Sequence, residues 1–241
     1  MVATPTFKIK IYSDGADLGD MQAINKNDFV TGFTTNPSLL KKAGVTNYLE
    51  FAKKTVATFP DEPISFEVFS NDFPTMEKEA HLLHDLGKNV YVKVPIRTTD
   101  GQSTAELIHN LTAAGVQVNV TAIATTDQVA ESLAAIEPGT QSIVSIFVGR
   151  VADTGADPRP FVAESAALTA KRDEVELLWA STREINNIYQ AQEAGVDIIT
   201  VPPAIIAKLV SHFGQTGDEV TMNTVKGFEA DIKATGLHIL D

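Results

Sequence analysis

One lysine stands inside a stretch that is otherwise typical of a buried strand, Val90-Tyr91-Val92-Lys93-Val94-Pro95. Burying an ammonium group is unfavourable unless it is paired, so burial lowers the pKa of a lysine. A lysine that is neutral at working pH is a nucleophile that can form a Schiff base with a carbonyl compound. The stretch leaves a second interpretation open, in which Lys93 reaches solvent at the strand end or pairs with a buried carboxylate.

Polar or charged side chains stand at the ends of the other apolar stretches as well. Asp14 and Glu67 could act as general acids or bases around Lys93, although a carboxylate there is often only the N-cap of the next helix. Arg150 and Arg183 each enter a loop or helix start, where a guanidinium and backbone N–H groups suit a phosphate. Uncharged polar residues occupy further strand ends: Thr34, Thr35, Asn36, Asn119, Thr121, Ser145 and Ser181.

These residues follow short β-rich runs that alternate with longer helical segments. The predicted strands are 8–13, 32–36, 64–69, 90–95, 116–122, 142–149, 175–181 and 197–202. Most are near-continuous apolar runs, as expected of parallel strands covered on both faces, and their starts lie about 22 to 33 residues apart. The order predicts an α/β fold, a single (β/α)8 TIM barrel over residues 1–241, with its active site at the carboxyl ends of the strands.

Glycines and one last helix complete the predicted pattern. Gly87, Gly115 and Gly195 each stand between a helix and a strand, where glycine supplies a left-handed helix stop. No linker-like segment interrupts the chain, so we predict no domain boundary. Residues 218–237 read as an additional amphipathic helix that could cap the barrel or dock on a neighbouring subunit. Phe66, Phe69 and Trp179 are expected in the core.

The composition excludes several classes of function. With 19 Lys and Arg against 31 Asp and Glu, the net charge of −12 disfavours nucleic acid and anionic membranes as partners. The chain has no cysteine, which removes thiolate nucleophiles and fits a reducing compartment. Without an apolar run of membrane-spanning length, we expect a cytoplasmic protein. His81 and His84 lack an evident third ligand, so they favour a solvated helix face, and we expect no metal or other cofactor.

Five segments resemble the transaldolase family in its short form, in the same order and over nearly the whole chain. They are Thr34-Thr35-Asn36-Pro37-Ser38, Val92-Lys93-Val94-Pro95, Asn119-Val120-Thr121, Ser145-Ile146-Phe147-Val148-Gly149-Arg150 and Ala180-Ser181-Thr182-Arg183. The resemblance implies a Schiff-base transferase of the pentose phosphate pathway on a β/α barrel. Such an enzyme moves a dihydroxyacetone unit from sedoheptulose 7-phosphate or fructose 6-phosphate to glyceraldehyde 3-phosphate or erythrose 4-phosphate. The resemblance also implies that the protein binds sugar phosphates and forms a homo-oligomer.

The resemblance further implies a role for each matching residue. Lys93 would form the Schiff base, Asp14 would remove the C4 hydroxyl proton, and Glu67 with Thr121 would move protons through a water molecule. Asn36, Asn119 and Ser145 would hold hydroxyl groups, while Arg150, Ser181 and Arg183 would hold the phosphate. The full set implied for substrate binding is Thr35, Asn36, Asn119, Ser145, Phe147, Arg150, Ser181 and Arg183.

Two positions bear on the choice between related reactions. Fructose 6-phosphate aldolases of this family resemble transaldolases but carry glutamine and tyrosine where this chain has Glu67 and Phe147, so transaldolase is favoured. Release of free dihydroxyacetone and a catalytically silent sugar-phosphate-binding barrel remain alternatives. Ser13 and Gly15 flank Asp14 where the family commonly has an apolar residue and a threonine, and Gly15 offers a looser backbone support. Asp17 is expected to cap the first helix.

Overall fold

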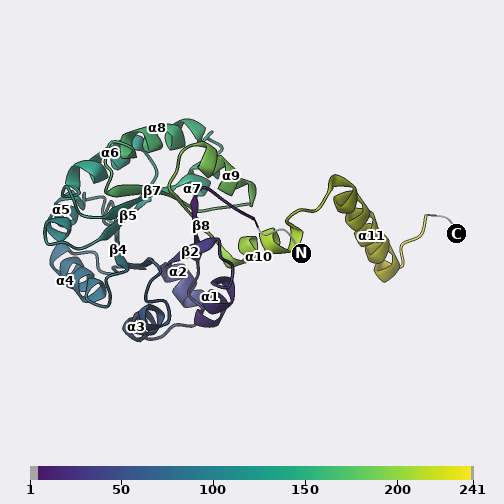
Figure 1. The fold of residues 1–241 in the computed structure, drawn as a ribbon, viewed down its shortest axis with the longest axis horizontal. Helices are drawn as coiled ribbons and strands as arrows, with labels where there is room; N and C mark the ends of the chain where they lie inside the picture. The colour runs from purple at the N-terminus through teal and green to yellow at the C-terminus, as the bar shows by residue number, and fades with distance from the viewer. Residues whose placement is uncertain (1–4, 240–241) are drawn as a thin grey trace.

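The computed structural model describes residues 5–239, in which eight parallel strands close into a barrel in sequence order (Figure 1). Each strand pairs with the next one along the chain, and β8 returns to β1. The predicted (β/α)8 TIM barrel is therefore confirmed. The strands are β1 (Lys10–Asp14), β2 (Val30–Thr34), β3 (Ile64–Glu67), β4 (Val90–Pro95), β5 (Val118–Ile123), β6 (Ser142–Phe147), β7 (Val175–Ala180) and β8 (Ile198–Val201).

Helices follow the strands and surround the barrel, with α11 as the exception (Figure 1). Asp17 accepts a hydrogen bond from the Asp20 N–H, which confirms its predicted role as the N-cap of α1. The helices are α1 (Leu18–Ile24), α2 (Pro37–Lys42), α3 (Tyr48–Thr58), α4 (Phe73–His84), α5 (Ala105–Ala113), α6 (Thr126–Ala135), α7 (Val148–Ala152), α8 (Arg159–Thr169), α9 (Asn186–Glu193), α10 (Pro203–His212) and α11 (Gly217–Thr235).

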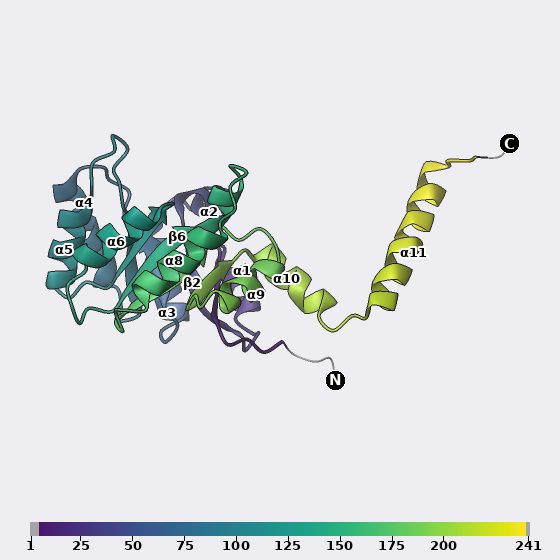
Figure 2. The ribbon, with the colours of Figure 1, turned by 90° about the horizontal axis from the view of Figure 1, so that it is seen from above.

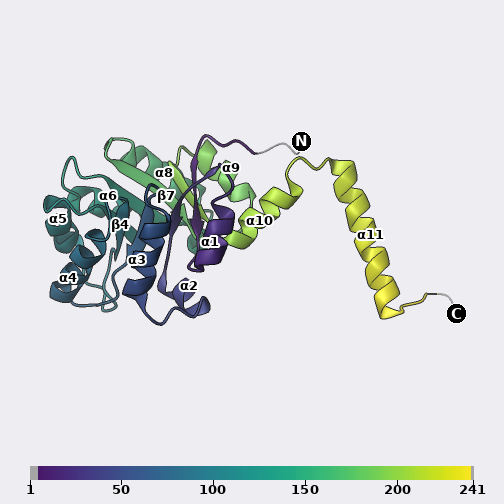
Figure 3. The ribbon, with the colours of Figure 1, turned by 60° about the horizontal axis from the view of Figure 1, so that its bottom comes forward.

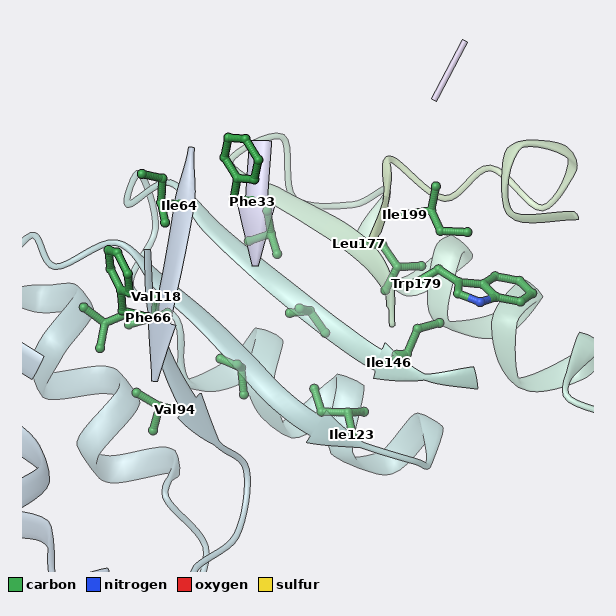
Figure 4. Packing of buried hydrophobic residues seen from close by; sticks show 14 of the residues in the cluster. Phe33, Ile64, Phe66, Val94, Val118, Ile123, Ile146, Leu177, Trp179 and Ile199 are labelled. Atoms are coloured by element: carbon green, nitrogen blue, oxygen red, sulfur yellow. The ribbon is translucent and has the colours of Figure 1, made fainter. Parts of the chain in front are cut away.

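Strand alternation divides the buried side chains into two layers. Residues such as Val118, Ile146 and Leu177 belong to the large core between strands and helices, part of which Figure 4 shows. The neighbouring residues in each strand point the opposite way, into the barrel. A second, smaller apolar cluster fills part of the barrel interior and contains Tyr12, Ile143, Leu178, Ala180 and Ile198. Polar residues are left for the interior positions nearer the carboxyl ends.

The predicted glycine stops are right at two of the three junctions. Gly115 has φ +82° and Gly195 has φ +76°, both in the left-handed region. Gly87 is not among the glycines with positive φ in the described part of the chain, so the expected left-handed stop is wrong there. A Cβ at Gly87 would lie 2.7 Å from Asn89 Oδ1 and 2.8 Å from Val56 Cγ1, so the glycine allows both side chains to pack closely here.

Helix α11 stands apart from the barrel (Figures 2 and 3). Thr216 and Glu219 form a capping box at its start, and Gly236 ends it with φ +65°, so the helix predicted over residues 218–237 is confirmed. None of its residues is buried, and its apolar side chains include Phe228, which is 63% exposed. Of the two places suggested for this helix, the cap on the barrel is not found, because the segment after α10 leads the chain away from the other helices (Figure 2), and docking on a neighbouring subunit stays a prediction.

Two of the three aromatic residues expected in the core are buried there. Phe66 and Trp179 belong to the large core, but Phe69 is 51% exposed, so its predicted burial is wrong. Strand β3 ends at Glu67, and Phe69 instead stacks on Tyr48 with ring centroids 4.3 Å apart. Within residues 5–239, we find no helix with the length and apolar character needed to span a membrane.

Candidate active site

A cavity of about 350 Å³ opens at the carboxyl ends of the barrel strands. Most of the residues predicted from the sequence line it together: Asp14, Asn36, Glu67, Lys93, Thr121, Ser145, Phe147, Arg150, Ser181 and Arg183. Thr35 and Asn119 are absent from the cavity wall, since their side chains are buried next to it. The strand-end residues therefore converge as their positions after parallel strands require.

Lys93 lies among the cavity residues and is only 6% exposed. Its Nζ donates a hydrogen bond of 2.9 Å to the Thr35 carbonyl oxygen and lies 3.6 Å from Glu67 Oε2. Thr35 thus contacts the lysine through its backbone, while its hydroxyl donates to the Ser65 carbonyl. The carboxylate partner that the sequence left open as an alternative is present, and the lysine still faces the cavity.

Tyr48 on α3 holds the backbone of Glu67. The Glu67 N–H donates to the Tyr48 hydroxyl at 2.8 Å, and that hydroxyl donates to the Glu67 carbonyl oxygen at 3.0 Å. Strand β2 pairs with β3 only as far as Ser65 and makes no sheet hydrogen bonds with Glu67. The Tyr48 hydroxyl supplies these hydrogen bonds instead. Burial raises the pKa of the Glu67 carboxyl, while the Lys93 charge opposes this shift.

Asp14 is supported by Thr34 on the neighbouring strand. Thr34 Oγ1 donates to Asp14 Oδ1 at 2.8 Å, and the Thr34 carbonyl accepts a hydrogen bond from the Gly15 N–H. The backbone of Gly15 is therefore held by β2. This contact gives Asp14 the support that the sequence around it, Ser13 and Gly15, was not expected to provide. Burial raises the pKa of the Asp14 carboxyl, and the Lys93 charge and the Thr34 and Asn36 side chains act in the opposite direction.

A polar network occupies the barrel interior between β3, β5 and β6. Asn119 Nδ2 donates to Ser65 Oγ at 3.0 Å, and Ser145 Oγ donates to Asn119 Oδ1 at 2.7 Å. Both functional groups of the Asn119 amide are thereby engaged with protein atoms, and Asn119 positions Ser145 at the cavity wall. Thr121 also lines the cavity, and its Oγ1 is a buried atom without a hydrogen-bond partner in the described structure.

Backbone conformation at two strand ends is unusual for residues other than glycine. Ala122 has φ +63° and Ser181 has φ +65°, and both residues line the cavity. At Ala122 the pairing of β5 with β6 shifts register between Val120 and Ile123. Strain of this kind is found where a site requires a particular backbone path.

The mouth of the cavity carries the two predicted arginines. The Arg150 guanidinium lies 4.7 Å from the centre of the Phe147 ring, an arrangement that holds the cation over an aromatic face. Arg183 pairs with Asp153, and both side chains are about half exposed. The start of α7 packs directly on the loop after β7, since a Cβ at Gly149 would lie 1.8 Å from the Ser181 carbonyl oxygen.

Some residues of the site were missed from the sequence. Thr200 lines the cavity and contacts Thr34, and it could have been found because it interrupts the apolar run Ile198-Ile199-Thr200-Val201 much as Lys93 interrupts its own strand. Tyr48 carried no such signal, since it lies in a helix far from any strand end. Its contact with Glu67 depends on how α3 packs.

Metal-binding arrangements were sought among all described residues. Within residues 5–239, no group of three or more His, Asp or Glu side chains is placed so that it could hold a metal ion. His81 and His84 lie near the end of α4, on the outside of the barrel. The polar groups that converge in the described structure are those of the cavity.

The fold and the cavity together define a β/α-barrel enzyme whose active site lies at the carboxyl ends of the strands. Residues 11–239 match the family described as Transaldolase/Fructose-6-phosphate aldolase, and the chain belongs to this family. A protein named "Probable transaldolase" from Chelativorans sp. (strain BNC1) is 34% identical over 232 residues, which cover 96% of this chain and 100% of that protein. Another of the same name, from Parvibaculum lavamentivorans, is 35% identical, with coverage of 96% and 100%.

Solved structures with low sequence identity share the fold. A crystal structure of 2,3-dimethylmalate lyase has a TM-score of 0.57 at 12% identity and covers 97% of this chain and 85% of its own. The crystal structure of KGPDC from Streptococcus mutans has a TM-score of 0.53 at 13% identity and covers 95% of this chain and 99% of its own. These similarities support the barrel architecture and say nothing about substrate.

Proposed function

We propose that this protein is a transaldolase that transfers a dihydroxyacetone unit between sugar phosphates through a Schiff base on Lys93. The observation that supports this most is the buried amine at the cavity, which lies 3.6 Å from the Glu67 carboxylate and whose charge also acts on the Asp14 carboxyl. A nucleophilic amine with two potential proton-transfer groups is what a class I aldol reaction requires. Family membership adds independent support.

Schiff-base formation would use Lys93, Glu67 and Thr121. The Lys93 amine adds to the C2 carbonyl of the ketose phosphate, and the resulting alcohol leaves as water, so one proton must be delivered to that oxygen. Glu67 can deliver it because burial raises the pKa of its carboxyl. The Thr121 hydroxyl, which has no hydrogen-bond partner among residues 5–239, is available to hold the water molecule through which this proton moves.

Carbon–carbon cleavage would then depend on Asp14. Its carboxylate removes the proton of the C4 hydroxyl, the C3–C4 bond breaks, and the electron pair moves to the iminium nitrogen. The aldehyde leaves, and an enamine of three carbons stays on Lys93 until an acceptor aldehyde arrives and the steps run in reverse. Thr34 orients the carboxylate for this task through its hydrogen bond to Asp14 Oδ1.

The phosphate of the substrate would be held at the mouth of the cavity. The chain carries a net charge of −12, so attraction of an anion depends on local groups, here Arg150, Arg183 and the Ser181 hydroxyl. Arg183 is already paired with Asp153, so a phosphate must replace or share this partner. Arg150 instead lies over the Phe147 ring, and its charge acts on the Glu67 carboxyl.

Specific observations favour each of two other functions. The contact between Lys93 and Glu67 is what a non-catalytic sugar-phosphate-binding barrel would retain as an ion pair. The family name includes fructose 6-phosphate aldolase, which would release free dihydroxyacetone. Against the aldolase, Phe147 has no hydroxyl with which to assist release of the three-carbon unit by water.

Borohydride trapping separates these possibilities. Incubation with fructose 6-phosphate and reduction should add the mass of the reduced three-carbon or six-carbon adduct to the peptide that contains Lys93. Lys93→Ala should abolish the adduct, whereas Lys10→Ala should keep it, because Lys10 lies at the start of β1 and pairs with Glu176. A folded wild-type protein that forms no adduct would exclude the Schiff-base mechanism.

The acceptor dependence then distinguishes transferase from aldolase. We expect fructose 6-phosphate to be consumed rapidly only when erythrose 4-phosphate is present. Turnover at a similar rate without an acceptor, with free dihydroxyacetone as a product, would contradict the transaldolase proposal and support the aldolase.

A further inference from the structure

We propose that Thr200 on β8 is a positioning residue for Asp14, because its hydroxyl donates to Thr34 Oγ1 and thereby directs the only hydroxyl hydrogen of Thr34 to the Asp14 carboxylate. This inference rests on the proposed function, in which Asp14 is the base for carbon–carbon cleavage. Thr200 would act through Thr34 and without touching the reacting atoms itself.

The three groups come from neighbouring strands of the barrel. In the register of the sheet, Asp14 lies beside Thr34 on β2, while Thr200 on β8 lies beside Tyr12 of the same strand β1. Thr34 Oγ1 lies 2.8 Å from Asp14 Oδ1 and 2.5 Å from Thr200 Oγ1. Strand alternation therefore places both threonine hydroxyls on the interior face with the carboxylate.

When Asp14 is ionised, the number of hydroxyl hydrogens fixes the direction of the two hydrogen bonds that link Thr200, Thr34 and Asp14. A hydroxyl has one hydrogen, and a carboxylate can only accept. If Thr34 donated to Thr200, two oxygen atoms without a hydrogen between them would face each other at the Asp14–Thr34 contact of 2.8 Å. The favourable arrangement is Thr200 to Thr34 to Asp14, in which each hydrogen bond polarises the next.

Thr200 is well placed to keep this direction. It is 4% exposed, so water has little access to it. In the described part of the chain, the hydroxyl of Thr200 has Thr34 as its hydrogen-bond partner, and the Thr200 carbonyl accepts a separate hydrogen bond of 2.7 Å from the Thr182 hydroxyl. The backbone of Thr200 is thus held from the loop after β7, and its hydroxyl contacts Thr34.

The arrangement matters because Asp14 must be ionised to accept a proton. Its carboxylate faces the charges of Lys93 on β4 and Glu67 on β3 and the polar side chains of Thr34 and Asn36. Burial disfavours the ionised form, and hydrogen-bond donors oppose this effect. Removing the Thr200 hydroxyl would let the Thr34 hydrogen turn away and would weaken the donor on which Asp14 depends.

The test compares Thr200→Val, Thr200→Ser and a matched control in the donor reaction with fructose 6-phosphate and erythrose 4-phosphate. Because hydrogen bonds to charged groups are among the stronger ones in proteins, we expect kcat of Thr200→Val to fall about tenfold, with KM changed less than about twofold. In a plot of kcat against pH, the acidic limb of Thr200→Val should lie at higher pH than that of the wild type. Thr200→Ser should restore both properties.

Thr55→Val is the matched control. Thr55 is fully buried in α3, and its hydroxyl donates only to the Phe51 carbonyl within that helix. The same loss of a buried hydroxyl there should leave the pH profile and kcat unchanged. A general effect of destabilisation would instead affect both valine variants alike and would overturn the role assigned to Thr200.

Adduct formation on Lys93 separates failure of this inference from failure of the proposed function. If the wild type forms no adduct and has no activity, the proposed function fails. If the wild type is active and Thr200→Val keeps its kcat and pH profile, only the role of Thr200 is overturned. Circular dichroism would show whether Thr200→Val disturbs folding. In that case the smaller substitution Thr200→Ala is measured in the same way, and a change or no change in its kcat and pH profile supports or overturns the role of Thr200.

Discussion

Gly149→Ala tests how closely the start of α7 must approach the loop after β7. The added Cβ would lie 1.8 Å from the Ser181 carbonyl oxygen and 3.0 Å from Arg183 Nε. A carbon and an oxygen atom in favourable contact lie about 3.3 Å or more apart, so α7 and the loop must separate by about 1.5 Å. Backbone atoms form one side of the clash, and rotation of a side chain cannot relieve it.

The expected cost follows from this geometry. Overpacking of a close contact destabilises a protein by about 1–3 kcal/mol, and the backbone clash puts Gly149→Ala near the upper value of about 3 kcal/mol. For a chain of this size, that loss corresponds to a fall in Tm of about 6–12 °C. The same separation moves Ser181 and Arg183 relative to Arg150, and a displacement of about 1 Å in a binding site can lower activity about 100-fold.

Urea titration, thermal melting and steady-state kinetics would measure these effects. Gly227→Ala provides the control, since it adds the same methyl group within α11, where none of the described atoms lies within 4 Å of the new Cβ. We expect the control to keep wild-type stability or to raise helix stability by up to about 1 kcal/mol. A wild-type Tm together with a wild-type KM in Gly149→Ala would refute the close approach of α7 to the loop.

Four further variants test other parts of the structure. Tyr48→Phe should lower the free energy of unfolding by about 1–3 kcal/mol in urea titration, because the Glu67 N–H loses its partner; unchanged stability would contradict that contact. Burial raises the pKa of Asp14, so its carboxyl favours the folded state at low pH, and this contribution is lost as pH rises through the folded-state pKa. Asp14→Asn should therefore stabilise the protein more at about pH 8 than at about pH 4, and the reverse order in urea titrations would disprove the sign. Arg150→Ala should raise KM for phosphorylated substrates about 10-fold or more, through loss of a charge-assisted contact, and an equal effect on unphosphorylated fructose would argue against a phosphate site. Because Phe228 is 63% exposed on α11, we predict that α11 docks on a second copy of the chain and that Phe228→Glu lowers the mass measured by light scattering; a monomeric wild type would end this prediction.

The barrel could be predicted from the sequence because each of its signals is local. Apolar runs such as Val90–Pro95 mark buried strands, and polar residues at their ends point to the carboxyl edge. Closure of the barrel then brings Asp14, Glu67 and Lys93 to one cavity, since they lie at or near the carboxyl ends of neighbouring or nearby parallel strands. Strand periodicity and parallel pairing were sufficient for this part of the site.

The remaining features depend on packing between distant segments. Tyr48 reaches Glu67 only because α3 lies against β3, and no spacing in the sequence indicates that contact. Whether Thr35 offers its hydroxyl or its carbonyl to Lys93 depends on where β2 ends. The place of α11 was also unpredictable, because an amphipathic face shows that a partner surface is needed without showing which surface that is.

The apolar cluster inside the barrel has a consequence for the order of events in the proposed reaction. Tyr12, Ile143 and Ile198 are buried in the barrel interior, each two residues before a residue of its own strand that lines the cavity, so they close the interior beneath it, while Leu178 lies at the cavity wall. Substrates and products must then share one entrance, and the first aldehyde has to depart before the acceptor takes its place over the three-carbon unit. Under the proposed Schiff-base mechanism, one shared entrance gives a ping-pong sequence, which predicts parallel lines in double-reciprocal plots of rate against donor at several acceptor concentrations.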